Sequence, residues 1–275
     1  MDKTDFIIFT DLDGTLLDRN SYSFSAAIEA LNRIKEMNIP LILCSSKTKA
    51  EIEIWRERLD NNDPFISENG GAIFFSDNLN SGNKNPDERD GYRFIELGIP
   101  YTELMARFNE LKNKFGDRIR GFSEMDVDEL VGLTGLSQAE AVLAKQREYT
   151  EPFVFKGSKT DEKELEKSIE GLNLSLTKGG RFYCLLGDND KGKAVKILTH
   201  RYRKSHSGIE TVAIGDGYND LPMLKAVDVP ILVQKPGGSY DIQIDIPKLH
   251  RAHGVGPVGW NAGLMKILPF TVKKI

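Results

Sequence analysis

The chain has 275 residues, 40% of them hydrophobic and 28% charged, which suits a globular protein of one large domain or two of ordinary size. Its net charge of −4 gives no reason to expect nucleic acid or an anionic membrane as a main partner, and we expect neither. No stretch approaches the roughly 18 apolar residues of a membrane span, and the first apolar run is too short for a secretory leader. We therefore expect a cytoplasmic protein, a monomer or weak homodimer, in which Cys44 and Cys184 are buried free thiols.

The first informative stretch is Asp11-Leu12-Asp13-Gly14-Thr15, which follows the apolar run Phe6–Phe9. That run predicts a strand buried on both faces, and in open α/β sheets ligands bind just beyond the carboxyl ends of the strands. Two carboxylates at such a place repel each other unless a cation lies between them, and a divalent metal ion is the usual solution. One aspartate can then attack a phosphorus atom while the other transfers protons. A pair of turn or helix-cap aspartates is the structural alternative.

The next segments alternate between helix and strand. Helical spacing of apolar residues predicts a helix over 25–38, and short apolar runs predict strands at 41–44, 64–66 and 72–75. The last two strands are separated by the polar turn Ser67-Glu68-Asn69-Gly70-Gly71, whose glycines predict a tight reversal. The β-α-β-α-β order predicts an α/β fold with a doubly wound, mostly parallel (Rossmann-like) core sheet.

Polar residues after the second strand can hold an anion. Ser45, Ser46 and Lys47 precede a helix that Thr48 and Glu51 open as a capping box. Backbone N–H groups at the start of a helix, together with an ammonium group, suit a phosphate. Ordinary helix capping is the alternative, and Thr48 alone is sufficient for it.

Beyond a polar loop at residues 76–88 the pattern changes. The sequence predicts one long helix, a strand, two short capped helices, another strand and helix, and a hairpin, near residues 104–115, 118–122, 126–140, 152–155, 160–170 and 172–186. We expect an inserted α+β cap at 83–189 and a core formed by 1–82 and 190–275. In the cap, Arg147 and Arg181 lie in polar clusters, and Arg181, beside two glycines, could present a fork to a carboxylate or phosphate. Most arginines at helix ends are solvated or ion-paired.

A glycine-rich loop follows at Gly187–Lys193, matching G-x-x-x-x-G-K. We exclude a nucleotide-binding P-loop, because Ala194 replaces the hydroxyl that holds magnesium and two acids in the loop would repel a triphosphate. Lys191 instead opens a helix and can present its ammonium group to a nearby anion. A solvated surface lysine is the structural alternative.

The last motif is Gly215-Asp216-Gly217-Tyr218-Asn219-Asp220, which follows a buried strand at 211–214. Its glycines permit a sharp turn that can bring Asp216 and Asp220 to one side. If this strand lies beside the first one, Asp11, Asp13 and Asp216 form an oxygen-rich Mg²⁺ site. A further strand is expected at 229–233 and a terminal helix at 260–268.

Asp11–Thr15 together with Gly215–Asp220 resembles the motifs of the haloacid-dehalogenase-like hydrolases, and Ser45 and Lys191 match that family's second and third motifs in order. The insertion is similar to the cap of the Cof-type branch. The resemblance implies that Asp11 forms an aspartyl-phosphate and that Asp13 acts as general acid and base. It also implies that Ser45 and Lys191 neutralise phosphoryl charge. The ligands of Mg²⁺ would be Asp11, Asp13 through its carbonyl and Asp216, while Asp220 would order Lys191 or a metal-bound water.

Several local strings resemble a narrower family, the mannosyl-3-phosphoglycerate phosphatases. These strings are residues 43–48, 68–71, 146–149, 151–153, 179–182 and 256–260. The resemblance implies a small phosphorylated sugar-glycerate substrate and a product, mannosylglycerate, that is a compatible solute. A glycerate carboxylate suits Lys47 or an arginine, and sugar hydroxyls suit Glu68 and Asn69. The residues expected to bind substrate are Ser46, Lys47, Thr48, Glu68, Asn69, Gly70, Arg147 and Arg181.

Other functions stay open. The substrate could be glucosyl-3-phosphoglycerate, or both compounds, or a broader range of sugar phosphates. A phosphomutase shares the aspartyl-phosphate step but returns the phosphate to its substrate. A catalytically dead module that senses a phosphorylated metabolite would have lost a carboxylate, whereas Asp11, Asp13, Asp216 and Asp220 are all present.

Overall fold

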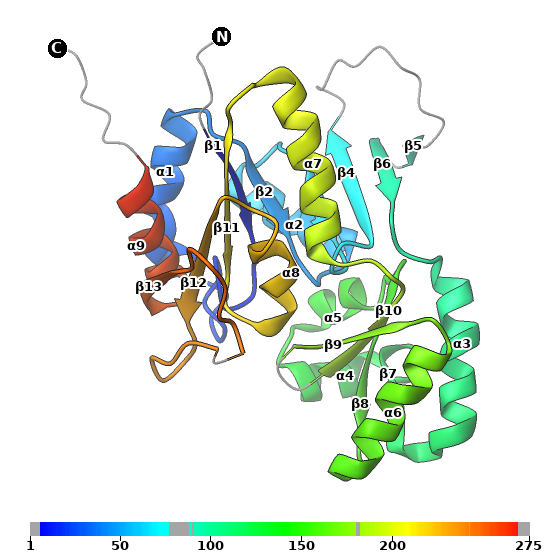
Figure 1. Ribbon diagram of the computed structural model, residues 1–275. Helices are drawn as coiled ribbons and strands as arrows, with labels where there is room; N and C mark the ends of the chain where they lie inside the picture. The colour runs from blue at the N-terminus through cyan, green and yellow to red at the C-terminus, as the bar shows by residue number, and fades with distance from the viewer. Residues whose placement is uncertain (1–5, 77–87, 90, 180–181, 242, 269–275) are drawn as a thin grey trace, which may run out of the picture. The chain divides into compact units, whose positions relative to one another are not determined.

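A computed structural model of the protein describes residues 6–76, 88–89, 91–179, 182–241 and 243–268 (Figure 1). The chain divides into two compact units. The first runs to Ser45 and resumes at Lys191, and the second is Ser46–Asp190. The segment predicted as a cap, 83–189, belongs to the second unit, which also includes 46–82, a segment that the sequence analysis assigned to the core.

Parallel strands form the sheet of the first unit, in the order β13-β12-β11-β1-β2. Their bounds are β1 Phe6–Thr10, β2 Leu41–Cys44, β11 Glu210–Gly215, β12 Val229–Gln234 and β13 His250–Val255. After β1 the chain forms β2 on one side of β1, and after the second unit it forms β11, β12 and β13 on the other side. The strand order therefore reverses between β1 and β11, which is where ligands bind in sheets of this kind.

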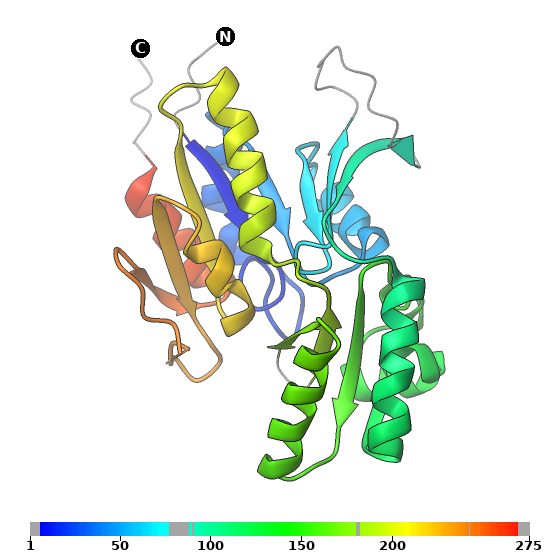
Figure 2. The ribbon, with the colours of Figure 1, turned by 45° about the vertical axis from the view of Figure 1, so that its right-hand side comes forward.

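Helices cover both faces of this sheet. Figures 1 and 2 show α1 with α9 on one face and α7 with α8 on the other. The bounds are η1 Ser25–Ala27, α1 Ile28–Glu36, α7 Lys191–Ser205, η4 Tyr218–Asp220, α8 Leu221–Leu224 and α9 Pro257–Ile267. The helix expected over 25–38 thus begins as a 3₁₀ turn and ends earlier. Its buried stripe is Ala27, Ala30, Leu31 and Ile34, whereas Ile28, one of the apolar residues at helical spacing, lies off the stripe and is 46% exposed.

Strand β13 was not predicted from the sequence. This edge strand buries only its small residues Ala252 and Gly254 and has no apolar run to announce it. Gly254 is needed because α9 lies very close: a Cβ there would come 2.7 Å from the Gly259 nitrogen. The signal for β13 is therefore a pair of glycines that lets a helix approach a strand, and that signal appears only in the fold.

The second unit contains two sets of antiparallel strands and their helices. In one set, β3 Phe65–Ser67, β4 Ala72–Ser76, β6 Tyr92–Glu96 and β5 Glu88–Arg89 pair in that order, and α2 Lys49–Leu59 precedes them. The predicted reversal between β3 and β4 is confirmed. The loop expected at 76–88 falls mainly on residues 77–87, outside the described residues.

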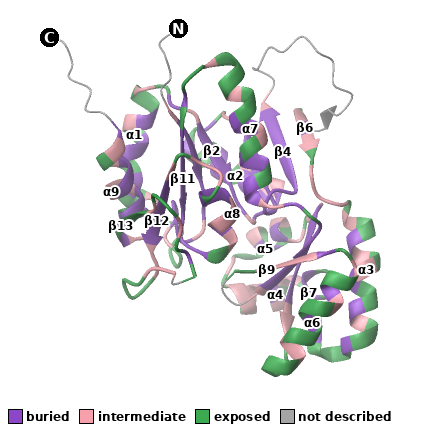
Figure 3. Cartoon of the chain, in the orientation of Figure 1, coloured by how far each residue is buried: buried purple, intermediate pink, exposed green. Residues whose placement is uncertain are grey.

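The other set is a separate four-stranded sheet, β7-β8-β10-β9, antiparallel throughout. It comprises β7 Ile119–Gly121, β8 Thr150–Phe155, β10 Phe182–Leu186 and β9 Ser175–Gly179, with α3 Tyr101–Phe115, η2 Gly116–Arg118, η3 Phe122–Glu124, α4 Val127–Thr134, α5 Gln138–Ala144 and α6 Lys159–Gly171. Alternation along β8 and β10 sends Phe153 and Leu185 into a core with α3 and α6, while Val154 and Phe182 pack with α4 and α5. Figure 3 shows the exposed outer sides of α3 and α6.

This architecture confirms the predicted α/β fold with a mostly parallel main sheet and an inserted α+β module. Cys44 and Cys184 are free and buried, as expected, and burial raises the pKa of the Cys184 thiol to about 12. In the described part of the chain, no helix combines the length and the apolar character that crossing a membrane requires.

A buried hydrogen bond joins α9 to β1 and provides a test of this packing. The indole Nε1 of Trp260 donates to the Thr10 hydroxyl oxygen at 2.9 Å, and that hydroxyl donates to the Asp11 carbonyl at 2.7 Å. Trp260→Phe removes the indole N–H and leaves a small void. We expect the free energy of unfolding, measured with urea, to fall by about 1–3 kcal/mol.

Ile28→Ala is the matched control, because Ile28 lies on the exposed side of α1 in the same unit. We expect that variant to stay within about 0.5 kcal/mol of the wild type. Equal losses in the two variants would contradict the role given to Trp260.

Candidate active site

Carboxylates from two neighbouring strands and a following turn meet at the edge where the strand order reverses. Asp11 follows β1, and Asp216 follows β11, the parallel neighbour in which Ile214 accepts from the Asp11 nitrogen at 3.0 Å. Asp220 ends the short helix η4. One oxygen of each of these three side chains lies within 4.8 Å of the others, and all three are buried.

Asp220 shapes the turn that carries Asp216. Its Oδ2 accepts from the backbone nitrogens of Asp216 at 3.0 Å and of Gly217 at 3.2 Å. A Cβ at Gly215 would lie 2.5 Å from the Asp220 Cβ, so the side chain can fold over the turn only because residue 215 is glycine. The predicted sharp turn is therefore held by one of the carboxylates that it brings into the site.

Lys191 supplies a positive charge inside this group. It is the first residue of α7, and its Nζ lies 2.6 Å from Asp11 Oδ1 and 2.7 Å from Asp220 Oδ1. Its side chain is 0% exposed. Burial alone would lower the pKa of Lys191, but the charges of Asp11 and Asp220 raise it above its ordinary value, so the ammonium group stays charged.

The carboxylates are strongly perturbed by their surroundings. Burial and the charge of Asp220 raise the pKa of Asp11 to about 7, against the opposing effect of Lys191. Burial also raises the pKa of Asp216, helped by the Asp11 charge and opposed by Arg19. Burial raises the pKa of Asp220 as well, with Lys191 acting in the other direction. These three carboxylates therefore tend either to hold a proton or to bind a cation.

The donor set fits a hard divalent cation, because all the converging ligand atoms are carboxylate oxygens. Asp220 accepts from three N–H donors, Lys191 on Oδ1 and the Asp216 and Gly217 nitrogens on Oδ2. Asp11 accepts from Lys191 and only distantly from a hydroxyl, at 3.3 Å, and Asp216 accepts from Arg19, so these two carboxylates keep more acceptor capacity. Asp11 and Asp216 are therefore the side chains best placed to ligate a metal ion. The contact of Asp220 with Lys191 is one of the two expected for it, whereas its hydrogen bonds to the turn were not predicted.

Asp13 was grouped with Asp11 and Asp216 as an oxygen ligand, with its carbonyl as the contributing atom. The oxygens of three aspartates converge, and among the described residues Asp13 is not one of them. The chain turns directly after β1, with Gly14 at φ 80° and its nitrogen donating to the Leu17 carbonyl at 2.9 Å. Asp13 still acts electrostatically, since its negative charge contributes to raising the pKa of Asp11.

Ser45 lies at the same edge of the sheet. It follows β2, which pairs in parallel with β1, Thr10 facing Leu43, and it is fully buried. The lysine that a P-loop would use, Lys193, is exposed on α7, whereas Lys191 points into the acidic group. This arrangement agrees with the rejection of a nucleotide-binding loop.

Two residues that bond to the clustered carboxylates were not predicted from the sequence. Thr15 donates from its hydroxyl to Asp11 Oδ2 at 3.3 Å, and Arg19 donates from Nη2 to Asp216 Oδ2 at 2.8 Å. Thr15 belongs to the motif and could have been assigned this role. Arg19 is a single cation in a polar turn, and no periodicity or spacing marks it.

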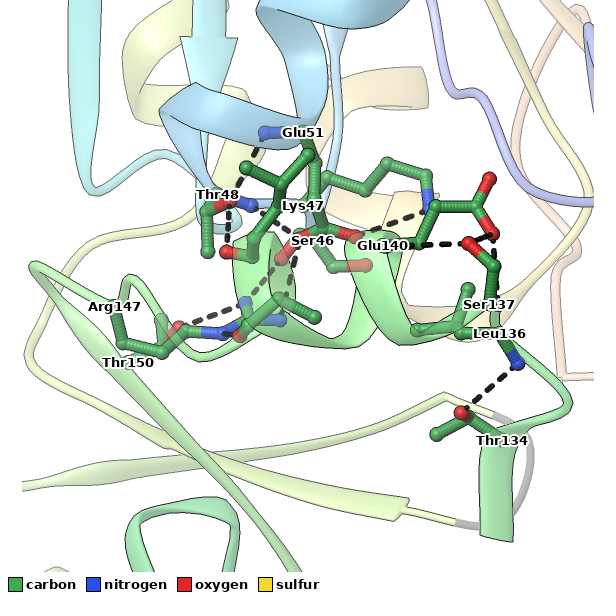
Figure 4. A network of polar contacts seen from close by, with 12 residues as sticks. Ser46, Lys47, Thr48, Glu51, Thr134, Leu136, Ser137, Glu140, Arg147 and Thr150 are labelled. Atoms are coloured by element: carbon green, nitrogen blue, oxygen red, sulfur yellow. Dashed lines mark hydrogen bonds and ion pairs between the residues drawn. The ribbon is translucent and has the colours of Figure 1, made fainter. Parts of the chain in front are cut away.

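In the second unit, Glu51 gathers three of the residues predicted to bind substrate, as Figure 4 shows. Its carboxylate accepts from the Thr48 nitrogen at 2.9 Å, completing the predicted capping box, and pairs with Lys47 at 3.4 Å and Arg147 at 3.6 Å. Burial tends to raise the pKa of Glu51, but the charges of Lys47 and Arg147 outweigh it and hold the pKa below its usual value.

Arg147 also fixes the backbone next to Ser45. Its Nη1 donates to the Ser46 carbonyl at 2.7 Å, and its Nε donates to the Ala144 carbonyl at 2.8 Å. The Thr48 hydroxyl donates to the Leu143 carbonyl at 3.0 Å. These contacts tie residues 46–48 to the end of α5.

Glu68 and Asn69 lie in the turn after β3, both with positive φ, at 46° and 55°. Glu68 accepts from the nitrogens of Glu148 and Tyr149 and from the Thr150 hydroxyl, at 2.9, 3.1 and 2.6 Å, so its oxygens are already engaged. Buried Asn69 has no hydrogen-bond partner for its Oδ1 within the described residues. Arg181 lies outside the described residues. The assignment of these residues to the substrate stays a prediction.

Comparison with known proteins identifies the family of this chain and solved structures that share its fold. A family model described as haloacid dehalogenase-like hydrolase matches residues 8–235. A glucosyl-3-phosphoglycerate/mannosyl-3-phosphoglycerate phosphatase of Methanococcoides burtonii is 46% identical over 95% of this chain and 97% of that protein. A mannosyl-3-phosphoglycerate phosphatase of Pyrococcus horikoshii is 37% identical over 82% of this chain and 90% of that protein. A solved HAD-superfamily phosphatase from Bacteroides thetaiotaomicron shares the fold, with a TM-score of 0.65, 20% identity, and coverage of 96% of this chain and 93% of that one.

The raised pKa of Asp11 predicts a pH dependence of stability without metal. Between the unfolded value of 3.8 and the folded value of about 7, the folded protein holds a proton that the unfolded chain lacks. Stability is therefore lost as the pH rises through this window, by at most about 1.4 kcal/mol per pH unit. Asp11→Asn removes this titration, so in EDTA its free energy of unfolding should rise relative to wild type between about pH 5 and about pH 8.

Asp228→Asn is the matched control. Burial tends to raise the pKa of Asp228, but hydrogen bonds from Thr211 and the charge of Arg203 outweigh it and lower the pKa below its ordinary value. Asp228 therefore does not titrate in this window. The control should follow the wild-type pH profile. Parallel profiles for wild type and Asp11→Asn would contradict the raised pKa.

The contacts of Arg147 predict that it is needed for the fold of the second unit. Arg147→Ala leaves the buried carboxylate of Glu51 with less positive charge and the Ser46 carbonyl without its donor. We expect a loss of about 3–5 kcal/mol in the free energy of unfolding. Arg118→Ala is the control, because Arg118 forms an ion pair with Asp161 at 2.7 Å on the surface of the same unit. That variant should lose at most about 1 kcal/mol, and equal losses would refute the assignment.

Proposed function

We propose that this chain, which belongs to the haloacid dehalogenase-like hydrolases, is a phosphatase that hydrolyses mannosyl-3-phosphoglycerate to mannosylglycerate and phosphate. The observation that carries the proposal is the group formed by Asp11, Asp216 and Lys191, in a chain 46% identical to a relative named for this activity. That relative is named for both sugars, so glucosyl-3-phosphoglycerate is the second candidate substrate.

In the proposed reaction, a carboxylate oxygen of Asp11 attacks the phosphorus atom as the bond to the glycerate oxygen breaks. Asp13 gives a proton to the departing alkoxide. It then takes a proton from the water that attacks the aspartyl-phosphate, so that inorganic phosphate leaves and Asp11 is restored. Lys191, fixed between Asp11 and Asp220, holds its charge against the transferring group. Ser45 would bind a phosphate oxygen at the same edge of the sheet.

The proposed cofactor is Mg²⁺, held by Asp11 and Asp216 with the backbone carbonyl of Asp13. When bound, it supplies charge neutralisation for the phosphoryl group. The side chains account for the rest. Asp11 must be unprotonated to attack. Burial raises the pKa of Asp11, and the charge of Lys191 lowers it. A cation beside Asp11 acts in the same direction.

For the remainder of the substrate, we propose that residues 83–189 act as the cap that selects the sugar-glycerate. The proposed substrate contacts are Ser46, Lys47, Thr48, Asn69, Gly70 and Arg181. The carboxylate of Glu68, also expected to bind substrate, accepts three hydrogen bonds from within the chain, which supports a positioning role for this residue. The donors of Arg147 are used within the chain, at Ser46 and Ala144, which supports an indirect role for this residue. Alanine at a true contact should raise KM more than it lowers kcat.

The test is the release of inorganic phosphate from mannosyl-3-phosphoglycerate and glucosyl-3-phosphoglycerate, with Mg²⁺ or with EDTA. We expect metal-dependent release, abolished by EDTA and reduced about a thousandfold or more in Asp11→Asn. Asp228→Asn, which changes an aspartate remote from the motifs, should retain full activity.

The alternatives give other results. Cleavage of unrelated sugar phosphates, with neither glycerate compound turned over, would keep the chemistry and exclude the proposed substrate. Return of the phosphate to the substrate, without release, would indicate a phosphomutase. Binding without turnover of any phosphate ester would leave only the metabolite-sensing module.

A further inference from the structure

Arg19 stands apart from the motifs, yet it contacts the metal-binding group. Its Nη2 donates to Asp216 Oδ2 at 2.8 Å. The two partners differ in exposure: the Arg19 side chain is 40% exposed, and that of Asp216 only 5%. The guanidinium group therefore reaches in from solvent to a buried carboxylate of the site.

The local charges explain why a cation lies there. Asp11, Asp13, Asp216 and Asp220 contribute four carboxylates to this region, against Lys191. Although burial disfavours its charged form, Arg19 has a pKa raised above the ordinary value by Asp216, Asp13 and Asp11. A guanidinium at this point offsets part of the mutual repulsion of the carboxylates.

Lys191 and Arg19, the cations that the described residues show bonded to these carboxylates, are held very differently. Lys191 is fully buried and bonded to two carboxylates. Arg19 is partly exposed, and its described polar contact is the one with Asp216. Gly14 leaves room for it, since a Cβ at that position would lie 3.0 Å both from Arg19 Nη2 and from Asp216 Oδ2. Of the two, Arg19 is the side chain that can leave.

We propose that Arg19 is a built-in counter-cation that competes with the divalent metal ion for Asp216. Both cations draw on the same buried carboxylate, so each weakens the binding of the other. The guanidinium neutralises Asp216 while no metal is bound and moves out into solvent as the metal enters. This inference rests on the metal site of the proposed function, and it adds a residue that sets how tightly that site binds metal.

The test is direct binding of Mn²⁺ to EDTA-stripped protein, followed through the electron paramagnetic resonance signal of free Mn²⁺, with Mg²⁺ as competitor. Arg19→Gln should bind the metal about five- to tenfold more tightly than wild type. Arg19→Lys, which keeps the charge, should stay closer to wild type. Arg203→Gln is the matched control, because Arg203 pairs with Asp228 at 2.7 Å at similar exposure, 47%, in the same unit. Its metal affinity should be unchanged.

A second measurement separates competition from simple support of the fold. In EDTA, Arg19→Gln should have a lower Tm than wild type, and saturating metal should remove most of that difference. Arg203→Gln should show the same Tm difference in both conditions. Unchanged or weaker metal binding by Arg19→Gln would overturn the proposal.

The outcome also distinguishes this inference from the proposed function. If wild type binds metal and Asp216→Asn does not, the metal site stands, and the Arg19 variants alone decide the competition. If wild type binds no divalent metal, both the metal site of the phosphatase and the competition are refuted. Because metal binding is measured without substrate turnover, failure to cleave the expected substrates would not change the conclusion about Arg19.

Discussion

The mutual repulsion of Asp11, Asp216 and Asp220 is the constraint on which the rest of this site depends. Three buried carboxylates with oxygens within 4.8 Å of one another are unfavourable in the absence of positive charge. The parallel register of β1 and β11 forces two of them together, because each follows its strand at the same edge of the sheet. Lys191 offsets part of this repulsion from inside. What remains is a site with a surplus of negative charge and raised carboxylate pKa values, which is what a cation-dependent phosphatase requires.

The position of Lys191 in the chain couples this electrostatic balance to the fold. Lys191 is the residue with which the chain re-enters the first unit, after the whole of the second has been inserted. It opens α7, so the start of the helix places the ammonium group. Asp220 links Lys191 to the turn that carries Asp216, because it accepts hydrogen bonds from both.

Sequence reasoning succeeded where the signal was local. The apolar runs of β1, β2 and β11 identified strands, and the Thr48–Glu51 pair identified a capping box that the structure contains. It failed where the determinant was long-range. Arg19 matters because the fold brings it to Asp216, and β13 exists because glycines let α9 lie against it. The exposed side of Ile28 likewise follows from which face of α1 the sheet covers. Periodicity cannot reveal such pairings, because they depend on contacts between segments distant in the chain.

The strings that resemble mannosyl-3-phosphoglycerate phosphatases have a structural explanation of their own. Around Arg147, the side chains make contacts inside the second unit: Tyr149 packs against Gly71 and Gly98, and its hydroxyl donates to Glu96 at 2.9 Å. Glu151 accepts from the Tyr101 hydroxyl at 2.6 Å and from the Ser123 hydroxyl at 2.7 Å. Such strings specify a scaffold as much as a ligand. The relative named for both sugars is consistent with this, because a shared scaffold does not by itself separate mannosyl from glucosyl. A residue proposed to contact the sugar needs polar groups that are not already bonded within the unit. Buried Asn69, whose Oδ1 has no partner within the described part of the chain, meets that requirement, whereas Glu68, with three donors, does not.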